Sequence, residues 1–179
     1  MKIRNGFVSN SSSSSFIVIF PREPKSAADV HDMMFADVGY STDDEWYDVP
    51  LSSIAIARWV WDDIQKQQTT PVSRVTVART FEGLSSRDFG RDYAEQSKAL
   101  PDPYEVDVDS EERWRRYRLQ DELVQRWADK AADEFLQDLP DEAMVYRFEY
   151  ADDSGNPQEG QMEHGDIFYR LPHKKISNH

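Results

Sequence analysis

Apolar residues gather in short runs that predict the strands of a small sheet. Residues 16–20 are apolar at every position, which indicates a strand buried on both faces and therefore inside the sheet. Apolar and polar side chains alternate over 146–150, the clearest period of two in the chain. Residues 72–81 also alternate and predict a strand. A turn at 153–157 predicts that 158–163 returns antiparallel as a hairpin partner.

Apolar residues at helical spacing predict helices between these strands. Ser26 can cap a helix that ends near Asp37, and Ser52 can cap a second helix that ends near Gln67. A shorter helix is expected to open at Ser85.

The longest helical pattern covers 110–139, either as one amphipathic helix or as two joined by an irregularity near Gln120. Asp109 or Ser110 can cap it, and Pro140 ends it. Its apolar stripe, expected to be buried, consists of Trp114, Tyr117, Val124, Trp127, Ala131, Phe135 and Leu139.

Together these elements predict an α+β fold. We expect a small, mostly antiparallel sheet covered by three or four helices, one of them long and amphipathic. The length of 179 residues suits a single domain over 1–179. A serine-rich lead-in over 1–15 and acidic loops at 39–50 and 101–110 complete this prediction.

The chain is strongly acidic, with 34 Asp and Glu against 21 Lys and Arg and a formal net charge of −13. One acidic block, 26–50, has seven acids and no Lys or Arg, and a second, 101–142, has fourteen acids and six bases. Such a surface repels phosphate, so we expect no direct nucleic-acid binding and favour a protein partner. The absence of cysteine excludes disulfides and thiolate zinc sites.

Hydropathy gives no sign of a membrane segment. No stretch approaches the roughly 18 apolar residues that a membrane-spanning helix needs. Asn5, Gly6 and the five consecutive serines Ser11 to Ser15, here called the serine run, stand where a signal peptide would have its apolar core. We therefore expect a cytoplasmic protein without a membrane partner.

One short segment, 113–118, combines four arginines with Trp114 and Tyr117, a composition that nucleic-acid-binding surfaces use. The alternative is a solvated helix face, because opposite charges stand four residues apart and both aromatic residues fall on the stripe expected to be buried. The charge pairs are Glu111 with Arg115, Glu112 with Arg116, and Arg118 with Glu122. We favour the solvated face.

Hydroxyl and imidazole groups near the two ends of the chain form the candidate ligand-binding site. The serine run can present hydroxyls and N–H groups to an anion, or it can be a structural lead-in or a modified segment. We expect at least one of its serines to lie within hydrogen-bonding reach of His164, His173, Ser177 or His179. The candidate ligand-binding residues are Ser11, Ser12, Ser13, Ser14, Ser15, His164, His173, Ser177 and His179.

Motifs of known catalytic and cofactor sites are missing from the sequence. It contains no P-loop ending, no dinucleotide-binding glycine pattern, no Gly-x-Ser-x-Gly elbow and no His-Glu-x-x-His pair. The spacing of the histidines matches no recognised zinc site. We therefore assign no catalytic residue, metal or cofactor, and lean away from an enzyme.

Two segments, one near each end, carry a recognisable pattern. The first comprises Lys2, Arg4, Gly6, Phe7, Val8, Ser9, Asn10, Ser11 to Ser15 and Phe16. The second comprises Phe148, Glu149, Tyr150, Asp152, Gly155, Glu163, His164, Gly165, Phe168, His173, Ile176, Ser177 and His179. This pattern resembles segments of uncharacterised proteins of tailed bacteriophages and some bacteria. The resemblance implies a phage origin, hence the host cell cytoplasm, and a joint role for the two ends, but no activity.

Three classes of function remain open. The leading hypothesis is a small phage accessory protein that binds a host or phage protein through its acidic surface, as a DNA mimic or as an inhibitor in host takeover. The first alternative is an enzyme or small-ligand-binding protein that uses the serine run and the C-terminal histidines. The second alternative is a structural component of the virion.

Overall fold

The computed structural model describes residues 13–36, 41–42, 50–66, 72–84, 86–151 and 157–178. The chain forms two compact units. We call residues 1–71 with 142–179 the sheet unit, and residues 72–141 the helical unit. The described elements, a three-stranded antiparallel sheet with helices that include one long one, confirm the predicted α+β class. The single domain expected over 1–179 stays a prediction.

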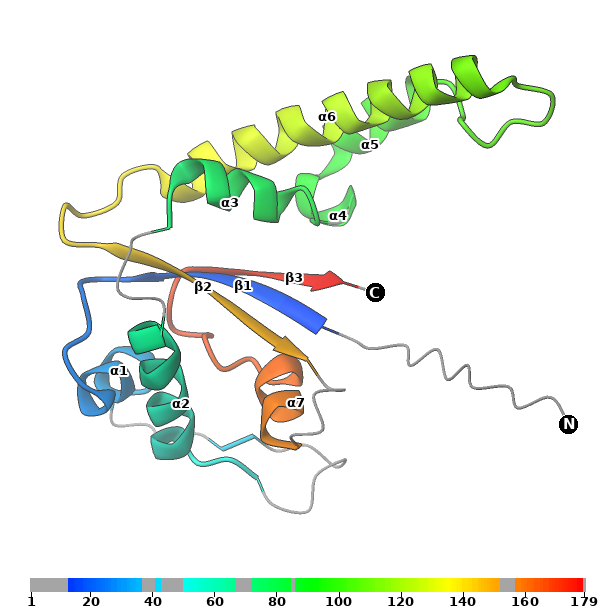
Figure 1. Cartoon of the computed structure of the whole chain (residues 1–179). Coiled ribbons are helices and arrows are strands. Elements are labelled where there is room, and N and C mark those ends of the chain that lie inside the picture. The colour runs from blue at the N-terminus through cyan, green and yellow to red at the C-terminus, as the bar shows by residue number, and fades with distance from the viewer. Residues whose placement is uncertain are drawn as a thin grey trace, which may run out of the picture. The chain divides into compact units, whose positions relative to one another are not determined.

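The sheet has the order β2-β1-β3, and both neighbours run antiparallel to the central strand (Figure 1). β1 spans Ser13–Phe20, β2 spans Met144–Ala151 and β3 spans His173–Asn178. The prediction of a doubly buried central strand over 16–20 is confirmed, because these side chains are at most 4% exposed. β1 begins at Ser13, so the end of the serine run belongs to the sheet and not to the lead-in predicted over 1–15.

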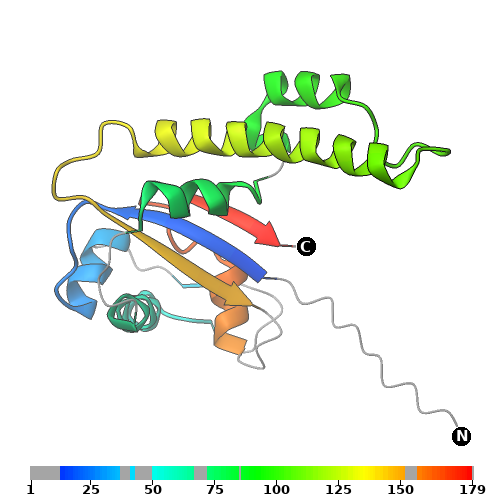
Figure 2. The same ribbon diagram turned by 45° about the horizontal axis from the view of Figure 1, so that its top comes forward.

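One face of the sheet and three helices enclose the core of the sheet unit (Figures 1 and 2). The helices are α1 (Ala27–Met34), α2 (Ser53–Lys66) and α7 (Pro157–His164). On the sheet, Phe16 lies opposite Phe148, and alternate positions of both strands point to the same face. The core contains Phe16, Val18, Phe20, Val30, Met34, Ile56, Val60, Ile64, Tyr146, Phe148, Tyr150 and Met162.

The two predicted helix caps in the sheet unit are confirmed. The hydroxyl of Ser26 accepts from the backbone N–H of Asp29 at 3.1 Å, at the start of α1. The hydroxyl of Ser52 accepts from the N–H of Ala55 at 3.3 Å, at the start of α2.

The hairpin strand predicted over 158–163 is wrong, because these residues form α7. Pro157 occupies the first helical position, where its missing N–H costs nothing. Two polar side chains of α7 are buried, and one of them, Gln161, accepts from the Thr42 hydroxyl at 2.5 Å and from the Leu51 N–H at 3.0 Å. The prediction relied on the turn expected at 153–157, and a turn does not fix whether a strand or a helix follows it.

The third strand is β3, which the sequence did not predict. It carries Lys174 and Lys175 beside a single large apolar residue, Ile176, so it lacks a clear period of two. It pairs with β1 through backbone hydrogen bonds that depend little on side-chain type.

The strand predicted over 72–81 is also wrong, because α3 spans Arg74–Phe81. Ser73 caps this helix by accepting from the N–H of Thr76 at 3.2 Å. The residues of α3 that are buried are Val77, Ala78 and Phe81, at helical spacing. Tertiary packing therefore overrides the strand preference of the valines and threonines in this segment.

In the helical unit, α6 spans Ser110–Leu136 without interruption, which settles the choice between one helix and two (Figure 2). Asp109 caps it by accepting from the N–H of Glu112 at 2.8 Å. The short helix predicted from Ser85 is divided into α4 (Ser86–Phe89) and α5 (Arg91–Ala99), because Gly90 has a φ of +85°. Aromatic contacts join α3 and α5 to α6, through Phe81 with Phe135 and Tyr93 with Trp127 respectively.

Candidate functional site

The serine run and the C-terminal segment meet in the sheet unit. Ser14 lies opposite Ser177 in the pairing of β1 with β3. The buried hydroxyl of Ser14 donates to Oε1 of Glu163 at 2.5 Å, and Glu163 is only 1% exposed. Ser11, Ser12 and His179 lie outside the described residues.

His164 and Lys175 complete what we call the Ser14–Glu163 cluster. Nε2 of His164 lies 3.0 Å from Oε2 of Glu163, and the His164 side chain is about half exposed. Nζ of Lys175 donates to the backbone carbonyl of Glu163 and lies 5.5 Å from the centre of the Phe16 ring. The structure thus brings Ser14 and His164 to the same carboxylate.

His173 makes contacts of its own at the start of β3. Its Nδ1 lies 3.0 Å from the carbonyl of Leu171, and its Nε2 lies 3.5 Å from Oδ1 of Asp166. The structure therefore places His164 and His173 in different polar contacts rather than around one ligand. Within the described ranges, no group of three or more His, Asp or Glu side chains is arranged to hold a metal ion.

A cavity of about 410 Å³ lies beside the serine end of β1. Ser13, Ser14, Ser15 and two acids, Glu149 and Glu159, line it together with Tyr150 and Ala151. Ser15 donates weakly to Glu149, at 3.4 Å. Because Ser14 is buried and its hydroxyl is bound to a carboxylate, we assign it a structural role and not that of a nucleophile.

A second candidate site, missed by the sequence prediction, lies on the helical unit. The predicted buried stripe of α6 is wrong: the buried residues are Leu123, Ala128 and Ala132, none of them in that stripe, and Trp114 is 67% exposed. Tyr104 and Val106, in the loop that precedes α6, are 75% and 83% exposed. The half-buried ring of Tyr117 lies between those of Tyr104 and Trp114, at centroid distances of 5.7 and 5.9 Å. We call Tyr104, Val106, Trp114 and Tyr117 the aromatic surface.

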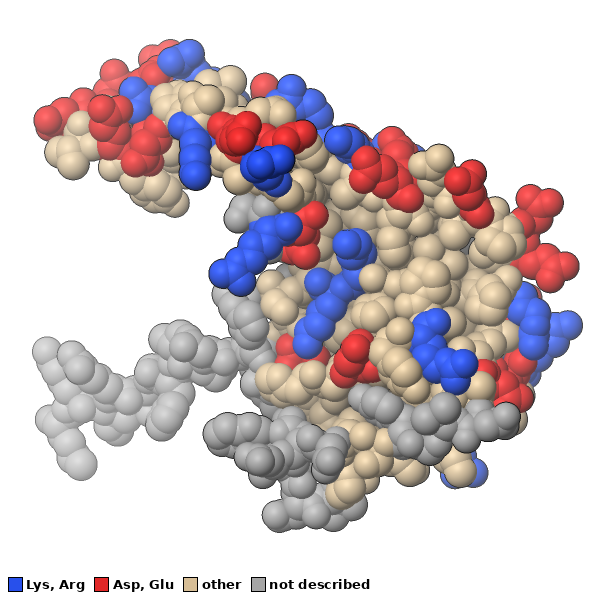
Figure 3. Space-filling model, turned by 180° about the vertical axis from the view of Figure 1, so that it is seen from behind, with Lys and Arg blue, Asp and Glu red and all other residues tan. Residues whose placement is uncertain are grey.

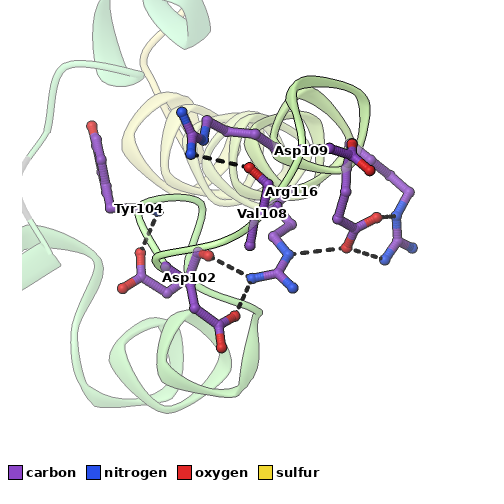
Figure 4. Close-up of polar contacts among 9 residues, drawn as sticks. Asp102, Tyr104, Val108, Asp109 and Arg116 are labelled. Carbon is purple, nitrogen blue, oxygen red and sulfur yellow. Dashed lines mark hydrogen bonds and ion pairs between the residues drawn. The ribbon is translucent and has the colours of Figure 1, made fainter.

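Arg116 fixes the loop that carries Tyr104 against α6 (Figure 4). Its Nη1 donates to the carbonyl of Asp102 at 2.7 Å and to Glu105 at 2.5 Å, while its Nε donates to Glu112 at 2.9 Å. The carboxylate of Asp102 accepts from the N–H of Tyr104 at 2.8 Å. These bonds hold the loop, and with it the aromatic surface, in one arrangement.

Carboxylates also engage the arginines of the 113–118 segment. Hydrogen bonds from Arg115 and Arg116 lower the pKa of Glu112 to about 2. The predicted Glu112 with Arg116 pair is present. Arg115 binds Glu112 rather than the predicted Glu111, and the predicted Arg118 with Glu122 pair is not formed among the described residues. Acidic side chains crowd this end of the helical unit, with basic ones beside them (Figure 3). The arrangement favours the solvated-face interpretation of the cluster.

Helix length explains why Trp114 is exposed. At about 1.5 Å per residue, the 27-residue α6 is roughly 40 Å long, whereas α3 and α5, which contact it, have eight and nine residues and are roughly 12 and 14 Å long. A regular apolar stripe can therefore continue beyond the helices that pack against it. The sequence did contain one sign of this exposure, because the segment 110–139 is much longer than the segments that flank it.

The fold and these two sites define a small α+β protein with one polar cluster in its sheet unit and one aromatic surface on its helical unit. Comparison with protein-family models, curated proteins and solved structures finds no match. None of the described helices is both long and apolar enough to cross a membrane.

Proposed function

We propose that this chain acts by binding another protein, as a small phage-encoded accessory protein of the host cell cytoplasm. The observation that carries the proposal is the exposure of Trp114 on an ordered part of the helical unit. The phage origin rests on the resemblance of the two terminal segments.

Two properties of the aromatic surface support protein binding. Tryptophan and tyrosine dominate the residues that contribute most to binding in protein interfaces. Tyr104 and Trp114 each contact Tyr117, and Arg116 already holds the loop of Tyr104, so little conformational freedom is lost when a partner binds.

DNA mimicry is the sharpest form of this proposal. The acidic block at 101–142 supports it, because carboxylates arranged along a helix can occupy a basic DNA-binding surface. The exposed rings of the aromatic surface add an apolar contact with the partner, which the phosphate groups of DNA do not make. Inhibition of a host DNA-binding protein during takeover follows from this form of the proposal.

Affinity capture from a lysate of the bacterial host, over a series of salt concentrations, tests the proposal. The wild type and Ile54→Ala, which changes an exposed apolar residue of the sheet unit, should retain the same protein. Trp114→Ala should lose it. If the partner is a DNA-binding protein, duplex DNA should release it. Equal capture by Trp114→Ala and the wild type would refute the aromatic surface as the binding site.

A small-ligand site is the second candidate, and the cavity of about 410 Å³ beside Ser13 to Ser15 supports it. Serine hydroxyls with Glu149 and Glu159 suit a ligand that bears hydroxyl or amino groups. Such a ligand should raise the melting temperature of the wild type but not that of Ser13→Leu, whose side chain reduces the cavity. A compound library screened by thermal shift measures this.

A further inference from the structure

Two tryptophans of α6 differ in what covers their rings. Nζ of Lys130 lies 4.5 Å from the centre of the Trp127 ring, a cation–π contact within the chain. Trp114 is more than half exposed, and within the described part of the chain no Lys or Arg lies over its ring. Trp114 therefore presents an open aromatic face of the kind that binds cations best.

The arginines closest to Trp114 in sequence are directed elsewhere. Arg115 donates through Nε and Nη2 to the two carboxylate oxygens of Glu112, at 2.6 and 2.7 Å. Nη2 of Arg113 donates to the carbonyl of Val108 at 3.2 Å. The chain's own guanidinium groups thus stabilise the loop and the helix end and leave the Trp114 ring uncovered.

The segment beside this open ring is acidic. Residues 101–112 contain six Asp and Glu and no Lys or Arg. Asp107 adjoins the exposed Val106, and Glu111 lies three residues, about one helical turn, before Trp114. In the described ranges, neither carboxylate forms an ion pair within 4 Å. Arg115 and Arg118 line the same surface pocket as Glu111 but form no ion pair with it, so the open ring and these carboxylates can attract a cation together.

We infer that the aromatic surface binds an arginine-bearing segment of the partner protein, with a guanidinium stacked on Trp114 and paired with Glu111 or Asp107. This inference rests on the proposed function and names the chemistry of the partner. Arginine fits better than lysine, because its planar guanidinium stacks on a ring while its edge still donates to a carboxylate. Arginine is also common in DNA-binding surfaces, so the inference agrees with the mimicry form of the proposal.

Arg118 allows a test in which the inference predicts whether a substitution strengthens or weakens binding. It lies four residues after Trp114 on the same side of α6 and forms no ion pair within the described residues. Because it repels a bound guanidinium, Arg118→Ala should strengthen binding of an arginine peptide. A surface that bound phosphate would respond in the opposite way.

The probe is a short peptide of alternating arginine and glycine, compared with its lysine and glutamine counterparts by isothermal titration calorimetry. The full-length wild type should bind the arginine peptide more tightly than the lysine peptide, and should not bind the glutamine peptide. Trp114→Ala should weaken binding about fivefold, the effect of an exposed cation–π contact. Glu111→Gln should also weaken it, whereas Asp138→Asn, beyond the other end of α6, should not.

Equal affinity of the wild type and Trp114→Ala for the arginine peptide, or weaker binding by Arg118→Ala, would overturn the inference. The affinity-capture experiment distinguishes a failure of the arginine inference from a failure of the proposed function. If Trp114 is needed for capture but the arginine peptide does not displace the captured protein, the proposed function stands and the arginine inference fails. If capture does not depend on Trp114, both fail.

Discussion

The hydroxyl of Ser14 donates to the buried carboxylate of Glu163, which follows it by 149 residues, at 2.5 Å. This bond joins the central strand of the sheet to α7. It also places the serine run and the C-terminal segment in one polar cluster.

Replacing Glu163 with Ala should therefore lower the free energy of unfolding by about 1–3 kcal/mol, because the Ser14 hydroxyl is left buried without its acceptor. Chemical denaturation measures this change. His164→Ala is the matched control, since its half-exposed side chain should contribute only about 0–1 kcal/mol. Equal stability of Glu163→Ala and the wild type would show that the cluster does not stabilise the fold.

Replacing Phe148 with Asp should unfold the sheet unit. Phe148 is 2% exposed, pairs with Phe16 and stacks on Phe168, so the substitution buries an unpaired carboxylate. We expect a loss of about 4 kcal/mol or more, measured by thermal denaturation, against a smaller loss for Phe148→Leu. An unchanged melting temperature would show that β2 does not contribute to the core.

The elements that the sequence predicted correctly are those whose local signals agree with their packing. Residues 16–20 are apolar on both faces and lie in the centre of the sheet, and Ser26 caps the helix that follows. The strand predicted over 158–163 was inferred from the turn before it, whereas this segment is a helix whose Gln161 and Glu163 are buried through polar contacts with distant parts of the chain. A local pattern contains no information about those partners.

The candidate sites also separate into residues that local patterns predicted and residues that depend on distant contacts. The predicted approach of the serine run to the C-terminal segment appears as Ser14 opposite Ser177. Glu163, which connects Ser14 to His164, was not a predicted site residue, because a carboxylate is seldom fully buried. Trp114 was assigned to a buried stripe because periodicity cannot show where the helices that cover α6 end.

Gly165→Ala should destabilise the end of α7. A Cβ at this position would lie 2.8 Å from the carbonyl oxygen of Gln161 and 3.1 Å from Cγ2 of Ile167. Space, not a positive φ, therefore requires glycine here. We expect a loss of about 1–3 kcal/mol in chemical denaturation, and at most about 1 kcal/mol for the exposed neighbour Asp166→Ala. Equal losses would contradict the steric argument.

Glu112 should titrate far below an ordinary glutamate. Hydrogen bonds from Arg115 and Arg116 lower its pKa to about 2 in the folded protein, against about 4.3 in an unfolded chain. Because the folded-state pKa is the lower one, the ionised side chain stabilises the fold above about pH 4.3, and this contribution disappears as the pH falls through about 2.

An NMR titration of the Glu112 side-chain carboxyl carbon measures this pKa directly. Replacing both Arg115 and Arg116 with Ala should move the titration midpoint up towards the ordinary value. A midpoint near 4.3 in the wild type would show that the two arginines do not hold the carboxylate in solution.

Duplex DNA should not bind this protein at physiological salt, although 113–118 carries four arginines. Phosphate binding requires guanidinium groups that are free to leave their protein partners. Arg116 donates to Asp102, Glu105 and Glu112, and Arg115 is bidentate to Glu112, so a phosphate would have to displace carboxylates within an acidic block. An electrophoretic gel-shift assay at submicromolar protein should therefore show no complex. A complex that Arg115→Ala with Arg116→Ala weakened would mean that these arginines exchange their carboxylates for phosphate, and the 113–118 segment would then be a nucleic-acid site.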